Sequence, residues 1–91
     1  MTNIEYNDLV DSLYRGHDVV FLYKGQHYFL ERDEKNHNLY KVSENLDSSE
    51  FLRKFGGENL ILRVNGFLEA KVFDMKSFNE IYSKMTIIDI E

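Results

Sequence analysis

Three histidines stand at equal intervals in the N-terminal half of the chain, at His17, His27 and His37. Imidazole binds transition metals and titrates near neutral pH, so this spacing suggests a metal site or a proton-transfer site. The residues from Asp18 to Arg32 predict a hairpin, however, and its length would separate His17 from His27. The sequence has no cysteine and no HxxxH pair that would support a metal site at these three histidines. We therefore expect no metal site, and an architectural role for the His17 imidazole at the last carbonyls of the preceding helix.

Several carboxylates could be read as acid-base pairs. Asp74 lies close to Ser77, and Glu31, Asp33 and Glu34 are near neighbours in the chain. A hydrolase needs two carboxylates that converge in a cleft with different environments, and nothing in the spacing indicates such a cleft. Helix capping accounts for Asp74, and a solvated loop accounts for the others. The chain has no GxSxG, Walker, GxGxxG or HExxH motif. We expect no enzymatic activity, no catalytic residue and no cofactor.

The length of 91 residues predicts one domain, residues 1–91, with an adequate but thin core. The absence of cysteine fits a reducing compartment. The first ten residues, MTNIEYNDLV, lack the basic start and apolar run of a signal peptide, and no apolar run approaches about 18 residues. We expect a cytoplasmic protein that does not bind membranes.

The net charge is −5, from 16 acidic and 11 basic side chains. Phosphate backbones are bound mainly by clustered lysine and arginine, and the basic residues here are scattered singly. Direct nucleic-acid binding is therefore not expected. The same charge suits a basic protein partner, although mild acidity also serves solubility.

The N-terminal residues predict a helix from about Asn3 to Arg15. Thr2 and Glu5 match a capping box, and Arg15-Gly16 forms a typical helix end. Apolar residues recur at helical spacing, at Tyr6, Leu9, Val10, Leu13 and Tyr14.

Two strands joined at Lys24-Gly25 follow. With Tyr23 opposite Gln26, one face becomes strongly apolar because Phe21 then opposes Tyr28 and Val19 opposes Leu30. We expect the second face to be largely covered too, since it carries mostly apolar residues, namely Val20, Leu22, His27 and Phe29.

The remaining segments predict a mixed series of short elements. They are a polar loop from Asp33 to Asn38, a strand from Leu39 to Ser43, a short helix from Asp47 to Phe55 ended by Gly56-Gly57, a strand from Leu60 to Val64, a hairpin turn or helical turn at 65–70, a helix around Phe78–Tyr82 and a strand from Thr86 to Ile90. The order is α-β-β-β-α-β-(α)-α-β. Helices and strands do not alternate regularly, which favours an α+β domain with a mostly antiparallel sheet and helices on one face.

An acidic stripe is the surface most suggestive of binding. It consists of Glu5, Asp8 and Asp11 on the outer side of the first helix and continues to Asp18. Carboxylates one helical turn apart resemble the charge spacing of nucleic acids and could occupy a basic groove, whereas the bland interpretation is a solvated helix face.

Two segments resemble small uncharacterised proteins of Firmicutes and their mobile elements. Residues 16–28, GHDVVFLYKGQHY, resemble a GHEIEFEYNGKKY hairpin, and residues 67–82, FLEAKVFDMKSFNEIY, are similar to an ELLENAKIFDGKSLKEIW ending. The chain departs from that pattern by Met75 in place of glycine and by an apparent insertion from Glu44 to Gly57. The resemblance implies the order of elements and transfers no catalytic residue.

These observations together predict a small, acidic, non-enzymatic protein that binds another macromolecule. A sharper hypothesis is a phage or mobile-element inhibitor, anti-CRISPR-like, that blocks a basic nucleic-acid-binding host protein. A bacterial interaction or regulatory module and a toxin-immunity protein stay open as alternatives. The oligomeric state and the identity of the partner are not predicted.

Overall fold

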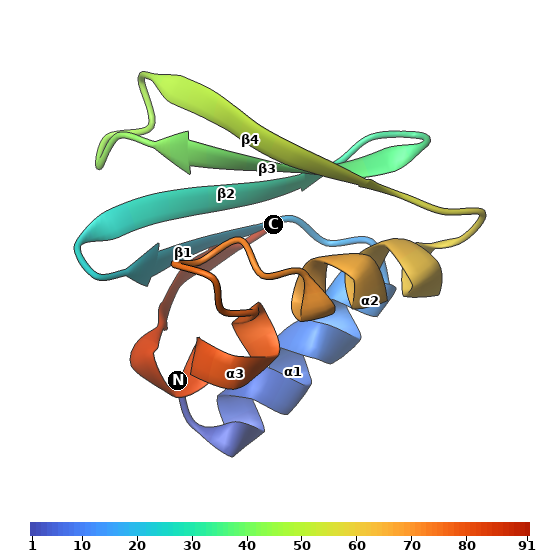
Figure 1. Ribbon diagram of the computed structural model, residues 1–91, viewed down its shortest axis with the longest axis horizontal. Coiled ribbons are helices and arrows are strands. Elements are labelled where there is room, and N and C mark those ends of the chain that lie inside the picture. The colour runs from blue at the N-terminus through green and yellow to red at the C-terminus, as the bar shows by residue number, and fades with distance from the viewer.

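The helices all lie against one face of a five-stranded antiparallel sheet, and no helix covers the other face (Figure 1). The computed structural model describes residues 1–91, and the strands follow the order β4-β3-β2-β1-β5. This arrangement confirms the predicted α+β class. Along the chain the elements are α1 (Asn3–Tyr14), β1 (Val19–Tyr23), β2 (Gln26–Arg32), β3 (Asn36–Val42), β4 (Ser49–Gly56), α2 (Leu60–Glu69), α3 (Phe78–Ile81), the short 3-10 helix η1 (Tyr82–Lys84) and β5 (Thr86–Ile90).

Local capping defines both ends of α1. The Glu5 amide donates to Thr2 Oγ1 at 3.1 Å and the Thr2 amide donates to Glu5 Oε1 at 2.9 Å, so the predicted capping box is present. At the other end, the His17 amide donates to the Ser12 carbonyl at 3.1 Å, and Gly16 has a φ of 90°. This is a Schellman-type end, and it is made by the His17 backbone rather than by its imidazole.

The hairpin of β1 and β2 has the predicted register. Phe21 pairs with Tyr28, Val19 with Leu30 and Tyr23 with Gln26. Lys24 and Gly25 connect the strands with φ values of 50° and 77°, the pattern of a type I′ turn. The turn therefore determines which side chains of the hairpin face the helices.

Phe21 lies at the centre of the core and is fully buried. Its ring centroid lies 5.3 Å from that of Tyr28, 6.2 Å from Phe67, 5.9 Å from Phe73 and 5.4 Å from Phe78. These rings come from β2, α2, the segment after α2, and α3. One aromatic cluster thus joins the sheet to most of the helical layer.

The prediction of a polar loop from Asp33 to Asn38 is wrong in its second half. Asp33 Oδ1 accepts hydrogen bonds from the Lys35 and Asn36 amides, which closes a turn within a few residues. Strand β3 therefore begins at Asn36, and His37 is a fully buried strand residue paired with Arg32.

The predicted short helix from Asp47 to Phe55 is also wrong, because Ser49–Gly56 forms strand β4. The Asp47 carboxylate does not cap a helix but accepts from Ser43 Oγ at 2.7 Å, within a turn that leads β4 back along β3. Phe55 is buried opposite His37, and a bulge between Leu39 and Tyr40 shifts the register further along.

The segment after β4 is helical where a strand from Leu60 to Val64 was expected. Asn59 caps α2 by accepting from the Leu62 amide at 3.0 Å, and the helix buries Val64, Phe67 and Leu68. Residues 65–69 are part of this helix, so the helical alternative for that region is correct. The aliphatic run at Leu60–Leu62 fits either a strand or a helix. The segment is a helix because its buried side packs against the sheet.

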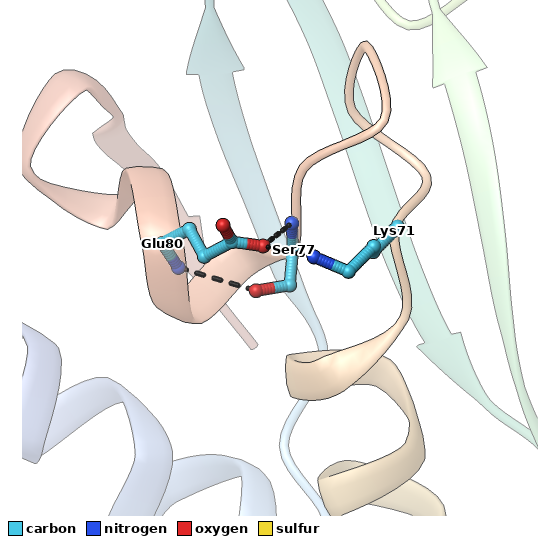
Figure 2. A network of polar contacts seen from close by, with 3 residues as sticks. All are labelled: Lys71, Ser77 and Glu80. Carbon is cyan, nitrogen blue, oxygen red and sulfur yellow. Dashed lines mark hydrogen bonds and ion pairs between the residues drawn. The ribbon is translucent and has the colours of Figure 1, made fainter.

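The segment from Lys71 to Ser77 ends in a second network of polar contacts. Ser77 Oγ accepts from the Glu80 amide at 3.2 Å, and Glu80 Oε1 accepts from the Ser77 amide and from Lys71 Nζ at 3.0 and 2.9 Å (Figure 2). These bonds lower the pKa of Glu80 to about 2. The cap of α3 is therefore Ser77, and the capping role expected of Asp74 is wrong.

Replacing Phe21 by alanine should destabilise the protein by about 3–5 kcal/mol, because it removes the central ring of the buried cluster. Chemical denaturation monitored by circular dichroism measures this change. As a control, Ile61→Ala removes a side chain that is 55% exposed and should change the free energy of unfolding by less than about 0.5 kcal/mol. Equal effects of the two changes would show that the cluster is not the core.

Met75→Gly should stabilise the protein by about 1 kcal/mol, because Asp74 and Met75 adopt φ values of 53° and 67° in a turn that glycine prefers. Gly25→Met is the converse control: a Cβ at Gly25 meets no atom within 4 Å, so only its backbone conformation with a φ of 77° opposes the change. It should destabilise the protein by a similar amount. Thermal melts of the two variants compare them directly, and destabilisation by Met75→Gly would contradict the strain argument.

Candidate partner-binding surface

The predicted acidic residues of α1 are exposed as expected. Asp8 and Asp11 lie away from the row of buried Leu9 and Leu13, whereas Glu5 precedes Leu9 by one turn in that same row. Two of the three already make intramolecular contacts. Glu5 belongs to the capping box, which lowers its pKa, and Asp11 forms an ion pair with Arg15 at 3.2 Å. Asp8 alone has no hydrogen bond or ion pair. The stripe is thus exposed to solvent, but two of its three carboxylates already stabilise the helix by contacts within it.

Asp18 does not extend this stripe but belongs to a corner of the sheet. Its Oδ1 atom accepts from the Arg32 amide at 2.9 Å, and its carbonyl accepts from the Glu91 amide at 2.8 Å. Side-chain hydrogen bonding with Asp89 is the main cause that raises the pKa of Glu91, and the negative charges of Asp89 and Asp18 add to it. We name Asp18, Asp89 and Glu91 the acidic corner.

A row of aromatic side chains crosses the sheet face that no helix covers. Register pairs join Val20 to Phe29, Phe29 to Tyr40 and Tyr40 to Phe51, so the four share one face on four adjacent strands. The ring centroids of Phe29 and Tyr40 are 6.4 Å apart, and those of Tyr40 and Phe51 are 5.7 Å apart. We name Phe29, Tyr40 and Phe51 the aromatic row.

Exposure increases along this row toward the β4 edge. Val20 is buried, Phe29 and Tyr40 are half-buried, and Phe51 is 54% exposed. The expectation that the second face would be largely covered therefore holds only beside β1, where Leu46 of the β3–β4 loop helps to form the surface. Contiguous exposed rings of this kind are typical of contact surfaces for other molecules.

Shallow hollows flank Phe29 on both sides. One of about 230 Å³ is lined by Phe29, Glu31, Tyr40 and Ser49. The other, of about 220 Å³, is lined by Val20, Phe29, Val42, Leu46, Ser49 and Glu91 and adjoins the acidic corner. A partner with apolar side chains beside a basic group would match both the hollows and the charge.

Sequence reasoning found Phe29 on this face but missed Tyr40 and Phe51. The segment SEFLRKF lacks strict alternation of apolar and polar residues because of the bulge in the β3–β4 pairing. The aromatic residues at Phe51 and Phe55 were the available signal, and their spacing also fits a helix.

The structure separates the three histidines. His17 is exposed after α1, His27 lies half-buried on the uncovered face, and His37 is buried on the helical side at the opposite end of β2. No group of three histidine, cysteine, aspartate or glutamate side chains is arranged to hold a metal ion. The absence of metal binding stays a prediction that elemental analysis of untagged protein tests.

α1, the longest helix, has 12 residues, and no helix combines the length and apolarity that a bilayer crossing requires. Comparison with protein-family models, curated protein sequences and solved structures gives no match. The resemblance of the hairpin and the C-terminal helix to small Firmicutes proteins therefore stays a prediction.

Protonation of His37 should destabilise the fold. Neither ring nitrogen has a hydrogen-bond partner. Burial is the first cause that lowers the pKa of His37, and Arg63 and Arg32 add to it against the opposite effects of Asp18 and Asp33. Because the unfolded chain binds a proton near pH 6.5 more readily than the folded chain, stability is greatest above about pH 6.5 and falls as the pH decreases.

His37→Leu should remove this loss of stability between about pH 6.5 and 4.5. Asp33 and Glu80, each with a pKa of about 2, favour the fold at higher pH, and their contributions are lost only below that window. Urea denaturation of both proteins at pH 7.5 and 5.0 measures the difference. If the variant loses as much stability as the wild type, another group is responsible.

Proposed function

We propose that the protein is a small non-enzymatic binding domain that docks on another protein through the uncovered face of its sheet. The observation that carries the proposal is the aromatic row, which places one exposed ring and two half-buried rings on three adjacent strands of the uncovered face. Aromatic side chains bury much area with little loss of conformational freedom, and they are enriched at the energetic centres of interfaces.

Carboxylates near the row outnumber Lys54, which lies on the same face, and this balance favours a basic partner. Asp18, Asp89 and Glu91 lie at the β1–β5 side, and half-buried Glu31 lines a hollow in the row. Exposed aromatic rows on sheets can also stack nucleic-acid bases. Here the adjacent carboxylates and the net charge of −5 would repel phosphates. An apolar protein patch bordered by lysine or arginine is the better match.

The acidic stripe on α1 is an alternative docking surface rather than part of the same one. Helix α1 lies beneath the sheet (Figure 1), and the register of β2, β3 and β4 places the aromatic row on the face that no helix covers. A single flat partner surface could not contact both. The aromatic row is favoured because its apolar area is free, whereas Glu5 and Asp11 are engaged within the helix.

Basic grooves of nucleic-acid-binding proteins are a partner class with this chemistry. By occupying such a groove, the protein would act as an inhibitor of the anti-CRISPR type, encoded by a phage or mobile element. A regulatory interaction module or a toxin-immunity protein would use the same surface on a different partner. In each case the protein acts by steric and electrostatic docking and performs no chemistry.

The test is affinity capture from a bacterial lysate, followed by binding measurements on the purified partner with matched variants. Phe51→Ser should weaken binding by about tenfold or more, because it deletes the most exposed ring of the row. Ile61→Ser removes an apolar side chain of equal exposure, 55% against 54%, from the helical layer and should leave binding unchanged. Raising the salt concentration should slow association.

A third variant, Asp8→Asn with Asp11→Asn, separates the two surfaces while leaving the capping box intact. A large loss of affinity in this variant with none in Phe51→Ser would assign docking to the acidic stripe and overturn the role of the aromatic row. A partner without a basic surface would overturn the electrostatic part of the proposal.

A further inference from the structure

A second concave site lies on the opposite side of the sheet, where the helical layer ends. It is a cleft of about 430 Å³, within the range of small-molecule sites. Its floor is the sheet beside the Lys24-Gly25 turn, and its wall is the segment after α2, whose tip lies near the end of β1 (Figure 1). The lining residues are Tyr23, Lys24, Gln26, Tyr28, Lys41, Leu52, Arg53, Val72, Phe73 and Asp74.

The cleft is locally basic in an acidic protein. Its lining has three cations, Lys24, Lys41 and Arg53, and one carboxylate, Asp74. Lys24 pairs with Asp74 at 3.3 Å. Lys41 and Arg53 have no carboxylate within 4.0 Å, since the other ion pairs of the protein are Arg15–Asp11 and Lys71–Glu80. The lining therefore has an excess of two positive charges that form no ion pair, while Glu50 is the register partner of Lys41 and the Arg53 guanidinium lies 5.4 Å from the centre of the Phe55 ring.

Neutral donors and apolar walls complete the cleft. The Tyr28 hydroxyl makes no hydrogen bond within the protein, and burial is the main cause that raises its pKa, so it stays a donor. Tyr28 pairs directly with Lys41 across β2 and β3, which places the hydroxyl and the ammonium on the same side of the sheet. Leu52, Val72 and Phe73 supply apolar contacts.

The wall of the cleft includes a strained turn. Phe73 and Lys76 exchange backbone hydrogen bonds at 3.0 Å in both directions, and the two residues between them adopt positive φ. The turn is joined to the hairpin by the Lys24–Asp74 ion pair, which is exposed to solvent. Strained backbone that is held in this way is often found where a protein clamps a ligand.

We infer that this cleft binds a phosphate monoester of a small ring-bearing molecule, with Lys41, Arg53 and the Tyr28 hydroxyl on the phosphate and the apolar wall on the ring. A phosphate monoester carries close to two negative charges at neutral pH, which matches the local excess of two cations. Guanidinium and ammonium groups are the donors that phosphates prefer, and the planar guanidinium can bind two oxygens at once. The cleft exceeds the size of phosphate alone, so the organic part occupies the remaining space. This site is distinct from the aromatic row, which lies on the other face of the sheet.

The experiment is a titration of the purified protein, followed by calorimetry and by amide chemical shifts, with adenosine monophosphate as the probe. Ribose 5-phosphate, inorganic phosphate and adenosine serve as the comparison ligands. Adenosine monophosphate should bind most tightly and should shift amides of the cleft. Lowering the pH from about 7 to 5 should weaken binding, because the phosphate loses its second charge near pH 6.

Arg53→Gln and Lys41→Gln should each weaken binding by about tenfold or more. Lys54→Gln is the matched control, because it makes the same charge change on the next residue of β4, whose register partner Asn38 places it on the other face. It should leave the affinity unchanged. Tyr28→Phe deletes only a hydroxyl, so it tests that contact in a folded protein even if the charge variants lose stability.

Three outcomes would overturn the inference. Equal weakening by Lys54→Gln and Arg53→Gln would show non-specific ion binding. Equal affinity for adenosine and its monophosphate would show that the phosphate is not recognised. No binding of any phosphate ligand at millimolar concentration would show that the cleft is not an anion site.

Discussion

The packing of helices on a single face of the sheet depends on the cluster around Phe21. Its ring contacts Tyr28 of the neighbouring strand and Phe67, Phe73 and Phe78 of the helical side. The core cluster of 16 buried residues lies between the sheet and the helices. No helix covers the second face (Figure 1), and that face keeps the half-exposed aromatic row. The helical layer also ends short of the Lys24-Gly25 turn, where the basic cleft remains.

Alternation along the strands gives the two faces different chemistry. Tyr28 and Phe29 are consecutive, yet one contributes to the cleft and the other to the aromatic row. Lys41 and Tyr40 are divided in the same way on β3. A sheet of five strands therefore presents an apolar surface with carboxylates at one end and, behind it, a cationic hollow. The two candidate sites thus share one scaffold but lie on opposite faces of it.

Net charge is a poor guide to where charge is available in this protein. Several carboxylates make contacts within their own segment of the chain: Glu5 and Glu80 complete capping boxes, Asp33 closes a turn, and Asp11 pairs with Arg15. Hydrogen bonds of this kind stabilise the charged form, as the lowered pKa of Asp33 and Glu80 shows. In the acidic corner, by contrast, side-chain hydrogen bonding with Asp89 is the main cause that raises the pKa of Glu91, and the charges of Asp89 and Asp18 add to it.

The sequence by itself determined the features that depend on interactions between residues close together in the chain. Thr2, Glu5 and Gly16 predict the ends of α1, Lys24-Gly25 predicts the hairpin register, and helical spacing places Asp8 and Asp11 on the outer side. It did not determine whether Ser49–Gly56 and Leu60–Glu69 are strands or helices, because their aliphatic and aromatic residues fit either type of element. Pairing with the edge of β3 makes the first a strand, and packing against the face of the sheet makes the second a helix. The aromatic row depends on the pairing of Tyr40 with Phe51 past a bulge, and the cleft depends on Asp74 reaching Lys24. Such contacts join residues far apart in the chain, so only the tertiary structure could decide them.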